Sequence, residues 1–542
     1  MSFDCLLDQK SYELQLERLR AFYQKSWGHI WPTHELVADI PTDDSDDATA
    51  SDSDDDDSDA AMAIDSVSRV FTVYDDMKEV ATALGLSMFL PAIVIREEYK
   101  YLHGKLEKKS ESVQRKYAAV VTGQPGIGKT TFLVYLLLQR LQQKKPTAFQ
   151  VKMDHFCLFD EEGVALLTVK EPACKRLGAC WALVGSNASL EKPCELFTSE
   201  AMVIVQTASP EPAKWKGWLK QLLGDVIVSE LPTTLEIAAI AKEFKLDATL
   251  TGRLVRKWGP STKNIITLLE HWGNEKMKWY LEKNLRDDVE AAARAVLASP
   301  EGLFAMLIDT NARALSSTGS AAVFVRPFQG EGRRWLSRSQ VFIPTEYLAG
   351  IVGNQSTQLA NADVLKLFAE LSTHSFTKSP ASWKFEMDMH RLLCGGGAAI
   401  IINKFSGFGE IFGQKMVMTP ATELLPGTLN ALASASSSDA FYWLPYVTNF
   451  PGIDGVLGDR DGNVFAVQST FNAEHVGPEE GLVKAWTHMA RDVRETRSWH
   501  FVAVANTAAT ARNLGRIMTK QLETFTLGKT KVHVWSCSLS LR

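Results

Sequence analysis

The stretch Gly123-Gln-Pro-Gly-Ile-Gly-Lys-Thr130 matches the phosphate-loop (P-loop) pattern G-x-x-x-x-G-K-[ST]. An apolar, partly β-branched run at 118–122 precedes it and predicts a buried strand, and the apolar run at 132–138 follows it and predicts a helix. Glycines let the backbone wrap a polyphosphate with its N–H groups, and the start of a helix adds partial positive charge. The strand–loop–helix context therefore predicts a nucleotide-binding site.

The predicted cofactors are ATP and Mg²⁺. We expect Lys129 to reach the β- and γ-phosphates and the Thr130 hydroxyl to coordinate the metal ion. The residues expected to hold the nucleotide are Gly123, Gln124, Pro125, Gly126, Ile127, Gly128, Lys129, Thr130 and Thr131.

Size and composition indicate a multidomain globular protein. A chain of 542 residues with 45% hydrophobic and 23% charged residues has room for several cores. No apolar run reaches the ~18 residues needed to span a bilayer, and the first residues lack the layout of a signal peptide. The seven cysteines are scattered and form no C-x-x-C pair. These features predict a reduced compartment, nucleus or cytoplasm, and no membrane association.

An acidic tract dominates the charge of the chain. Ten aspartates lie between Asp43 and Asp59, and removing them from the net charge of −6 leaves about +4 for the remainder. Such a tract cannot bury apolar surface and is expected to be disordered. It is interpreted either as a solubilising linker or as a nucleic-acid mimic that covers a basic groove of the same chain.

The order of predicted elements divides the chain into five parts. Alternating strands and helices predict a parallel α/β sheet with crossover helices, followed by a helical section that begins at Thr234. The expected parts are an N-terminal helical segment (1–40), an acidic disordered linker (41–66), a P-loop NTPase with a helical lid (67–275), a connecting α/β region (276–379) and a separate α/β domain (380–542).

ATP hydrolysis needs an acidic residue at the end of a strand next to the P-loop strand. The expected place is the end of the strand Ala179–Val184, where the chain continues with Gly185 and offers no carboxylate. Asp154, Asp160 and Glu161 could substitute only in a suitable geometry. The sequence therefore predicts nucleotide binding more firmly than hydrolysis.

Other polar residues near the expected nucleotide are weaker candidates. The run Gln206–Ser209 could sense the γ-phosphate, or its hydroxyls could simply cap a strand end. Lys263 could touch a phosphate or be solvated, and Arg253 and Arg256 are candidate arginine fingers for a possible homo-oligomer.

Several segments resemble the Crinkler proteins and the related retrotransposon-hot-spot proteins. The resemblance covers about residues 95–275 and continues to the end of the chain; its segments are Arg96–Tyr99, Val121–Thr130, Cys180–Val184, Gln206–Pro210, Trp215–Trp218 and Trp258–Ser261. It implies an AAA-like P-loop NTPase followed by a C-terminal nuclease of the restriction-endonuclease fold. The resemblance further implies action on DNA in the nucleus, which in several members of the group is the DNA of a host.

Three departures from that family pattern stand out. Gly185 occupies the place of the family's Walker B aspartate, and Lys263 stands where an arginine is usual. The targeting motif of secreted Crinklers is absent, so the sequence does not support delivery of this protein as an effector into another organism.

The C-terminal block contains the residues of a restriction-type nuclease in the right order. Such enzymes place a helix glutamate, a strand aspartate and a strand Glu or Gln around Mg²⁺, which polarises the phosphodiester and activates water. Glu386, Asp454 and Gln468 match these positions as metal ligands and catalytic residues. The 14 residues from Asp454 to Gln468 suit a hairpin whose strands share one face.

The lysine of the restriction-type motif is missing. Thr470 stands at its position, and the candidate substitutes are His475, which the family resemblance favours, and Lys484. His390 follows Glu386 by one helical turn and is more often a packing residue than a ligand. Basic residues suited to phosphates, or to a solvated helix face, are Arg491, Arg494, Arg497, Arg512, Arg516 and Lys520.

The predicted function is an ATP-binding, DNA-directed protein whose P-loop NTPase regulates a Mg²⁺-dependent nuclease, with double-stranded DNA as the expected partner. The alternative is a nucleotide-switched signalling or scaffold protein whose C-terminal domain binds a partner without cleaving it. The absent Walker B carboxylate and the absent lysine favour this alternative. A metabolic kinase is disfavoured because no acceptor-site residues accompany the P-loop.

Overall fold

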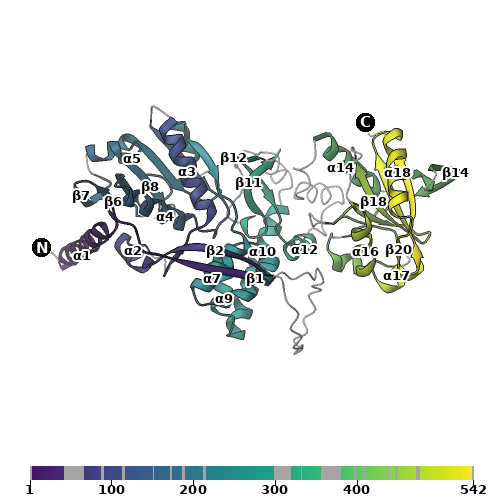
Figure 1. Ribbon diagram of the computed structural model, residues 1–542, viewed down its shortest axis with the longest axis horizontal. Coiled ribbons are helices and arrows are strands. Elements are labelled where there is room, and N and C mark those ends of the chain that lie inside the picture. Colours follow the sequence, from purple (N-terminus) through teal and green to yellow (C-terminus); the bar gives the residue numbers. More distant parts are fainter. Residues whose placement is uncertain are drawn as a thin grey trace.

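A computed structural model provides the fold (Figure 1). The described residues are 3–41, 66–86, 91–112, 116–150, 152–170, 174–185, 190–211, 215–297, 319–330, 333–355, 380–395, 398–406, 409–425, 427–436, 439–445, 450–470 and 477–539. Figure 1 shows the N-terminus and the C-terminus at opposite ends of the molecule.

The first sheet holds the P-loop. Its seven strands run in the order β10-β4-β9-β8-β5-β6-β7. The first five strands in this order are parallel to one another, whereas β6 is antiparallel to β5 and β7 is antiparallel to β6. Their bounds are β4 Tyr117–Thr122, β5 Thr147–Gln150, β6 His155–Asp160, β7 Gly163–Thr168, β8 Trp181–Gly185, β9 Val203–Thr207 and β10 Asp225–Val228. The predicted parallel α/β sheet is confirmed.

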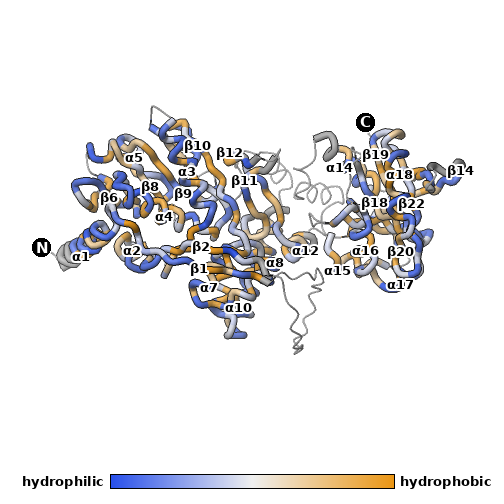
Figure 2. The backbone as a smooth tube through the Cα atoms, in the orientation of Figure 1, coloured by the Kyte–Doolittle hydropathy of each residue, from blue (hydrophilic) through white to orange (hydrophobic). Residues whose placement is uncertain are grey.

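Helices cover both faces of this sheet. On one face α3 (Glu97–Ser112) and α4 (Lys129–Gln142) pack against alternate residues of β4, β8 and β9. On the other face η1 (Lys175–Ala179), α5 (Glu195–Glu200) and α6 (Lys216–Gln221) pack against the remaining residues of the same strands. Both faces of the strands are apolar, as a buried parallel sheet requires, and Figure 2 shows the hydrophobic colour concentrated in β8, β9 and α4.

The N-terminal segment belongs to this P-loop unit. Leu19 and Phe22 of α1 (Phe3–Ser26) and Trp31 share a core with α4. The strands on either side of the acidic tract, β1 (Thr33–Pro41) and β2 (Ser66–Tyr74), pair antiparallel in register along their whole length. The acidic tract therefore joins the two strands of one hairpin instead of linking two separate parts, although the tract itself lies outside the described residues.

Two short elements complete the N-terminal part. β3 (Ile93–Val94) pairs with β2, and α2 (Met77–Leu84) lies between them in sequence. The β1–β2 hairpin packs through Ala38, Phe71 and Val73 against Ala239 of the helical section.

The predicted helical section after Thr233 is present. It consists of α7 (Thr234–Glu243), η3 (Ala248–Leu250), α8 (Thr251–Trp258), α9 (Thr262–Glu270) and α10 (Glu275–Leu297). Thr233 and Glu236 form a capping box that fixes the start of α7.

A hairpin follows, which we call the hairpin unit (319–355). It contains η4 (Gly319–Ala321), the antiparallel strands β11 (Phe324–Gly330) and β12 (Arg333–Phe342), and α12 (Glu346–Gln355). These elements lie within the connecting α/β region that the sequence predicts over 276–379.

The C-terminal unit (380–539) contains an eight-stranded mixed sheet in the order β14-β13-β22-β19-β18-β17-β16-β15, in which β18, β19 and β22 are parallel. Its strands are β13 Ile400–Ser406, β14 Gly409–Met418, β15 Leu424–Leu425, β16 Phe441–Trp443, β17 Gly455–Gly458, β18 Asn463–Thr470, β19 Ser498–Ala505 and β22 His533–Ser538; β20 Thr526–Leu527 and β21 Thr530–Lys531 form a separate small hairpin.

Helices also sandwich the C-terminal sheet. Phe465 and Val467 of β18 pack on α14 (Pro380–Cys394), whereas Val464 and Ala466 pack on the other side. The helices there are α15 (Leu429–Ala433), α16 (Glu479–His488), α17 (Arg491–Thr496) and α18 (Ala508–Gln521). The segment 479–496 forms two helices and not one, because Met489 and Ala490 take extended ψ angles of 145° and 140°.

Candidate functional site

The P-loop lies between β4 and α4, as predicted. Gly123, Gly126 and Gly128 have φ angles of 148°, 78° and 98°, which non-glycine residues rarely adopt. A Cβ at Gly128 would overlap the Tyr99 hydroxyl. The glycines of the motif are therefore required by backbone conformation and by close packing.

Lys129 is held on the loop itself. Its partly buried ammonium group donates to the carbonyl oxygens of Gly123 and Gln124, both at 2.8 Å. Desolvation lowers the pKa of Lys129 to about 7. A bound polyphosphate would replace the two carbonyls as the partner of the Lys129 ammonium group. Its negative charge would favour the protonated form of the lysine.

Arg96, just before α3, and Tyr99, in the first turn of α3, support the P-loop. The Tyr99 hydroxyl donates to the Gly128 carbonyl at 3.1 Å. Arg96, only 1% exposed, donates to the Ile127 carbonyl at 2.9 Å and pairs with Glu236 of α7 at 3.1 Å. These contacts hold the Ile127 and Gly128 carbonyls of the loop in place.

The start of α9 touches the loop as well. The Lys263 backbone N–H donates to the Gly126 carbonyl at 3.0 Å, and the Ser261 hydroxyl oxygen would stand 2.9 Å from a Cβ on Gly126. The Lys263 side chain is exposed and begins beside the loop. Arg253 and Arg256, the arginine-finger candidates, are exposed on α8.

The strand expected to carry the Walker B carboxylate ends at Gly185, which pairs with Thr207 of β9. The suggestion that Asp154, Asp160 or Glu161 replaces this carboxylate is wrong, because all three lie too far from the P-loop. They flank β6, which three strands separate from β4, a distance of about 19 Å. Asp160 is moreover paired with Arg176, 2.6 Å from its Nε.

Part of the polar run Gln206–Ser209, at the end of β9, is not free to contact a nucleotide. The Gln206 side chain is fully buried, donates to the Glu191 carbonyl and accepts from the Trp218 indole, both at 2.9 Å. Its amide therefore has a structural role and cannot also sense a phosphate. The Ser209 hydroxyl is buried and has no hydrogen-bond partner within the described part of the chain.

In the C-terminal unit, a buried polar cluster lies between α14 and the sheet. The Tyr442 hydroxyl is 2.5 Å from His390 Nδ1, and His390 Nε2 is 3.8 Å from Glu386 Oε1. Burial, aided by the nearby charges of Cys394, Asp454 and Glu386, raises the pKa of Tyr442 well above its usual value. Tyr442 is therefore a neutral tyrosine whose hydroxyl lies within electrostatic reach of Glu386 and Asp454.

Asp454 closes the open end of the β17–β18 hairpin. Its carboxylate accepts from the Ser469 backbone N–H at 2.6 Å and from the Ser469 hydroxyl at 2.8 Å. The register pairs Gly455 with Val467 and so sets Asp454 opposite Gln468. By strand alternation the Gln468 side chain lies on the Ala466 face, whereas Tyr442 and α14 lie on the Val467 face.

The two residues predicted to replace the missing lysine are His475 and Lys484. His475 lies outside the described residues. Lys484 of α16 has its ammonium nitrogen 5.8 Å from the centre of the Phe450 ring, close to the segment that leads into Asp454. Within the described ranges, no three His, Cys, Asp or Glu side chains come together as a metal site would require.

The prediction that Arg497 contacts phosphates is wrong. Arg497 is 3% exposed and donates to the backbone carbonyls of Asp459, Ser436 and Asp439 at 2.8, 3.0 and 2.9 Å. It fastens the β17–β18 turn to the loop before β16. Arg491 pairs with Glu495 on an exposed surface, and Arg512 and Arg516 are exposed on α18.

Sequence reasoning missed Tyr442 and gave Gln124 no role beyond the P-loop. A lone tyrosine on a short strand has no motif around it, and Gln124 is a variable position of the P-loop pattern. Their partners are 52 and roughly 200 residues away in the chain, as the His390 contact and the Ser320 contact show. No local pattern contains such contacts.

The fold and this loop together define an α/β protein with a phosphate-loop motif at the carboxyl edge of a mainly parallel sheet. No family model and no curated protein matches the sequence. Among solved structures, the chain is similar to the RuvB Holliday junction branch migration motor of Thermotoga maritima, with 12% identity and a TM-score of 0.24 over 37% of this chain and 76% of that chain. A substituted form of the same motor gives 13% identity and a TM-score of 0.25 over 39% and 78%.

TM-scores of this size carry no argument about fold or activity. The similarity to the Crinkler group therefore stays a prediction from the motifs. Within the described stretches, no helix is both long and apolar enough to cross a membrane.

Proposed function

We propose that the P-loop unit binds ATP with Mg²⁺ as an AAA-like module and acts as a nucleotide-controlled switch for the C-terminal unit. The observation that carries the proposal is the Lys129 ammonium held by two P-loop carbonyls at the start of α4. The strand order supports the AAA-like class, because one strand, β9, separates the P-loop strand β4 from β8, whose end is the Walker B position. Because β8 ends at Gly185, the proposed role is binding and switching more than rapid hydrolysis.

Replacing Lys129 by alanine should weaken ATP binding by roughly 30-fold, the loss of about 2 kcal/mol that charge-assisted bonds to phosphate contribute. The measurement is a titration with a fluorescent ATP analogue and Mg²⁺. Lys108→Ala, at an exposed position of α3, is the matched control and should bind like the unchanged protein. Equal affinities of all three proteins would refute the nucleotide site.

ATP binding should also take up a proton above pH 7. The pKa of Lys129 is lowered to about 7, so the side chain is mostly neutral at pH 8, and the phosphates restore its charge. We expect an uptake of roughly 0.9 proton at pH 8 and an affinity that falls with rising pH above 7. Calorimetry in two buffers of different ionisation enthalpy measures the uptake, which should vanish in Lys129→Ala.

A second candidate function is Mg²⁺-dependent cleavage of DNA by the C-terminal unit. It is favoured by two acidic residues, Glu386 and Asp454, whose charges both act on the buried Tyr442 hydroxyl, and by the position of Asp454 opposite Gln468 at the end of a hairpin. The C-terminal unit is a mixed sheet with helices on both faces, in which α14 precedes the β17–β18 hairpin and β18 and β19 are parallel. Glu386 and Asp454 would hold the metal ion and His475 would stabilise charge; Gln468, predicted as a third ligand, lies on the sheet face opposite α14 and so apart from Glu386.

Plasmid nicking in Mg²⁺ should fall at least ~100-fold in Asp454→Asn, because the amide loses the charge that grips the metal while keeping an acceptor for Ser469. Asp461→Ala, in the exposed turn of the same hairpin, should nick like the unchanged protein. If the unchanged protein shows no metal-dependent nicking, the C-terminal unit is instead a partner-binding module under nucleotide control.

A further inference from the structure

The Gln124 side chain ties the P-loop to the hairpin unit. It is 2% exposed, and both ends of its amide are used. Nε2 donates to the Ser320 carbonyl at 2.6 Å, and Oε1 accepts from the Val325 N–H at 3.2 Å. One P-loop residue therefore holds two points of the segment that begins β11.

The same residue also holds the phosphate-binding lysine. Its backbone carbonyl accepts from Lys129 Nζ at 2.8 Å. A polyphosphate competes for that ammonium group, so Lys129 cannot fully serve both Gln124 and the nucleotide. The loop thus has two states, in which Lys129 contacts either the Gln124 carbonyl or the nucleotide. The Gln124 backbone differs between these states, while its side chain contacts β11. Coupling between distant sites requires such a two-state element.

The hairpin has a second, fixed attachment to the P-loop unit. Arg334 of β12 forms a bidentate pair with Glu98 of α3, with both N–O distances 2.6 Å. Glu98 also accepts from the Glu230 N–H at 2.8 Å, just after β10. Since Glu98 is 6% exposed and this pair does not involve the P-loop, it is suited to act as a pivot.

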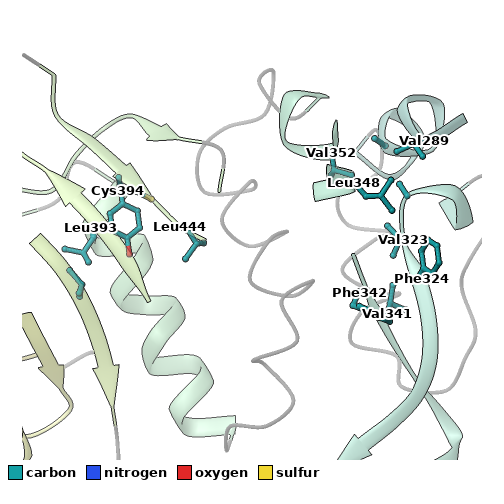
Figure 3. Close-up of a cluster of buried hydrophobic side chains, with 14 of the residues drawn as sticks. Val289, Val323, Phe324, Val341, Phe342, Leu348, Val352, Leu393, Cys394 and Leu444 are labelled. Carbon is teal, nitrogen blue, oxygen red and sulfur yellow. The ribbon is translucent and has the colours of Figure 1, made fainter. Parts of the chain in front are cut away.

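The hairpin and α12 pack as one body. Phe324, Val341 and Phe342 of the two strands share a core with Leu348 and Val352 of α12. Figure 3 shows these side chains gathered on one side, apart from the group Leu393, Cys394 and Leu444 of the C-terminal unit. A displacement of β11 is therefore passed to α12, because close-packed side chains move together.

The first turn of α12 reaches the C-terminal unit. Glu346 Oε1 accepts from the Leu429 N–H at 3.1 Å, and a Cβ on Gly350 would stand 3.2 Å from the Thr428 side chain. The Thr428 carbonyl accepts from the Trp443 indole at 3.0 Å. Trp443 follows Tyr442 in β16, and Tyr442 is the central residue of the polar cluster between α14 and the sheet.

We propose that Gln124 transmits the state of the P-loop to the hairpin unit, and that Glu346 passes it to the 427–445 segment beside the C-terminal cluster. This inference rests on the proposed ATP binding and specifies its regulatory route. ATP draws Lys129 away from the Gln124 carbonyl, Gln124 loosens its grip on Ser320 and Val325, and the hairpin moves about the Glu98–Arg334 pair.

Hydrogen exchange followed by mass spectrometry tests the first step. We expect Mg²⁺ and ATP to speed the exchange of the 319–330 segment, which contains the Val325 amide, roughly threefold in the unchanged protein. At ATP concentrations that saturate each protein, Gln124→Ala should lose this response, because the contact is absent in both states. Gln124→Glu, which keeps an acceptor for Val325 but loses the donor to Ser320, is the second variant and should respond weakly.

The second step is tested at Glu346. ATP should change the exchange of the 427–445 segment in the unchanged protein and in Glu346→Gln, whose amide oxygen still accepts from Leu429, but not in Glu346→Ala. A normal response in Glu346→Ala would overturn the route through α12.

A parallel titration with the fluorescent analogue separates the two levels of the proposal. Bound ATP with unchanged or slower exchange at 319–330 overturns the inference alone. Absence of ATP binding in the unchanged protein overturns the proposed function and the inference together.

Discussion

Replacing Arg96 by methionine should lower the free energy of unfolding of the P-loop unit by about 3–5 kcal/mol, the usual cost of leaving one member of a buried ion pair without its partner. Arg96 and Glu236 are 1% and 4% exposed, so neither charge can be solvated in the folded unit. The change also deprives the Ile127 carbonyl of its donor and should weaken ATP binding. Exchange of the slowest amides of β4 and α4 measures the loss.

A double variant separates charge burial from lost packing. Adding Glu236→Gln to Arg96→Met removes the unpaired carboxylate, and glutamine can still complete the capping box with Thr233. The double variant should therefore recover at least ~1 kcal/mol relative to Arg96→Met. Lys100→Ala, on the helix that follows Arg96 and in an exposed pair with Glu97, should cost well under 1 kcal/mol. A loss for Arg96→Met no larger than that for Lys100→Ala would contradict the structural role of the buried pair.

Replacing Gly455 by alanine should destabilise the C-terminal unit by about 2–3 kcal/mol through overpacking. The added Cβ would overlap the Tyr442 hydroxyl oxygen and stand 2.8 Å from its Cζ. Tyr442 is fully buried and its hydroxyl contacts His390, so the ring has no free space into which to retreat. Exchange of the β18 and β19 amides measures the effect.

The expected clash has its own control. Adding Tyr442→Phe removes the overlapping oxygen and should restore part of the stability lost in Gly455→Ala, because only the ring carbons then remain close. Tyr442→Phe by itself should be milder than Gly455→Ala. Additive effects of the two changes would show that Gly455 and Tyr442 are not in contact.

The sequence predicted the P-loop unit well because its patterns are local. The strand–loop–helix around Lys129 and the helical section after Thr233 both follow from residues close together in the chain. The hairpin that carries Asp454 and Gln468 was also expected, since the turn-forming residues between them and the period of the strands specify it.

Contacts between distant segments could not be predicted in this way. The acidic tract was expected to link two parts, but it joins β1 and β2, whose pairing depends on how α1 and the hairpin pack on the rest of the unit. Arg497 was expected at a phosphate-binding surface because a buried arginine and an exposed one look alike in a sequence. Only its four backbone acceptors show that it is structural.

The sequence by itself determined that the chain carries a phosphate loop between a buried strand and a helix, and that its C-terminal part is an α/β unit with acidic residues on a helix and a hairpin. Those features depend on neighbours in the chain, whose spacing sets which backbone and which face they form. Only the tertiary structure decided that Gln124 grips β11, that Arg96 supports the P-loop, and that His390, beside Glu386, contacts Tyr442. The physical reason is that each of these contacts joins segments far apart in sequence, and their meeting is fixed by packing of the whole core.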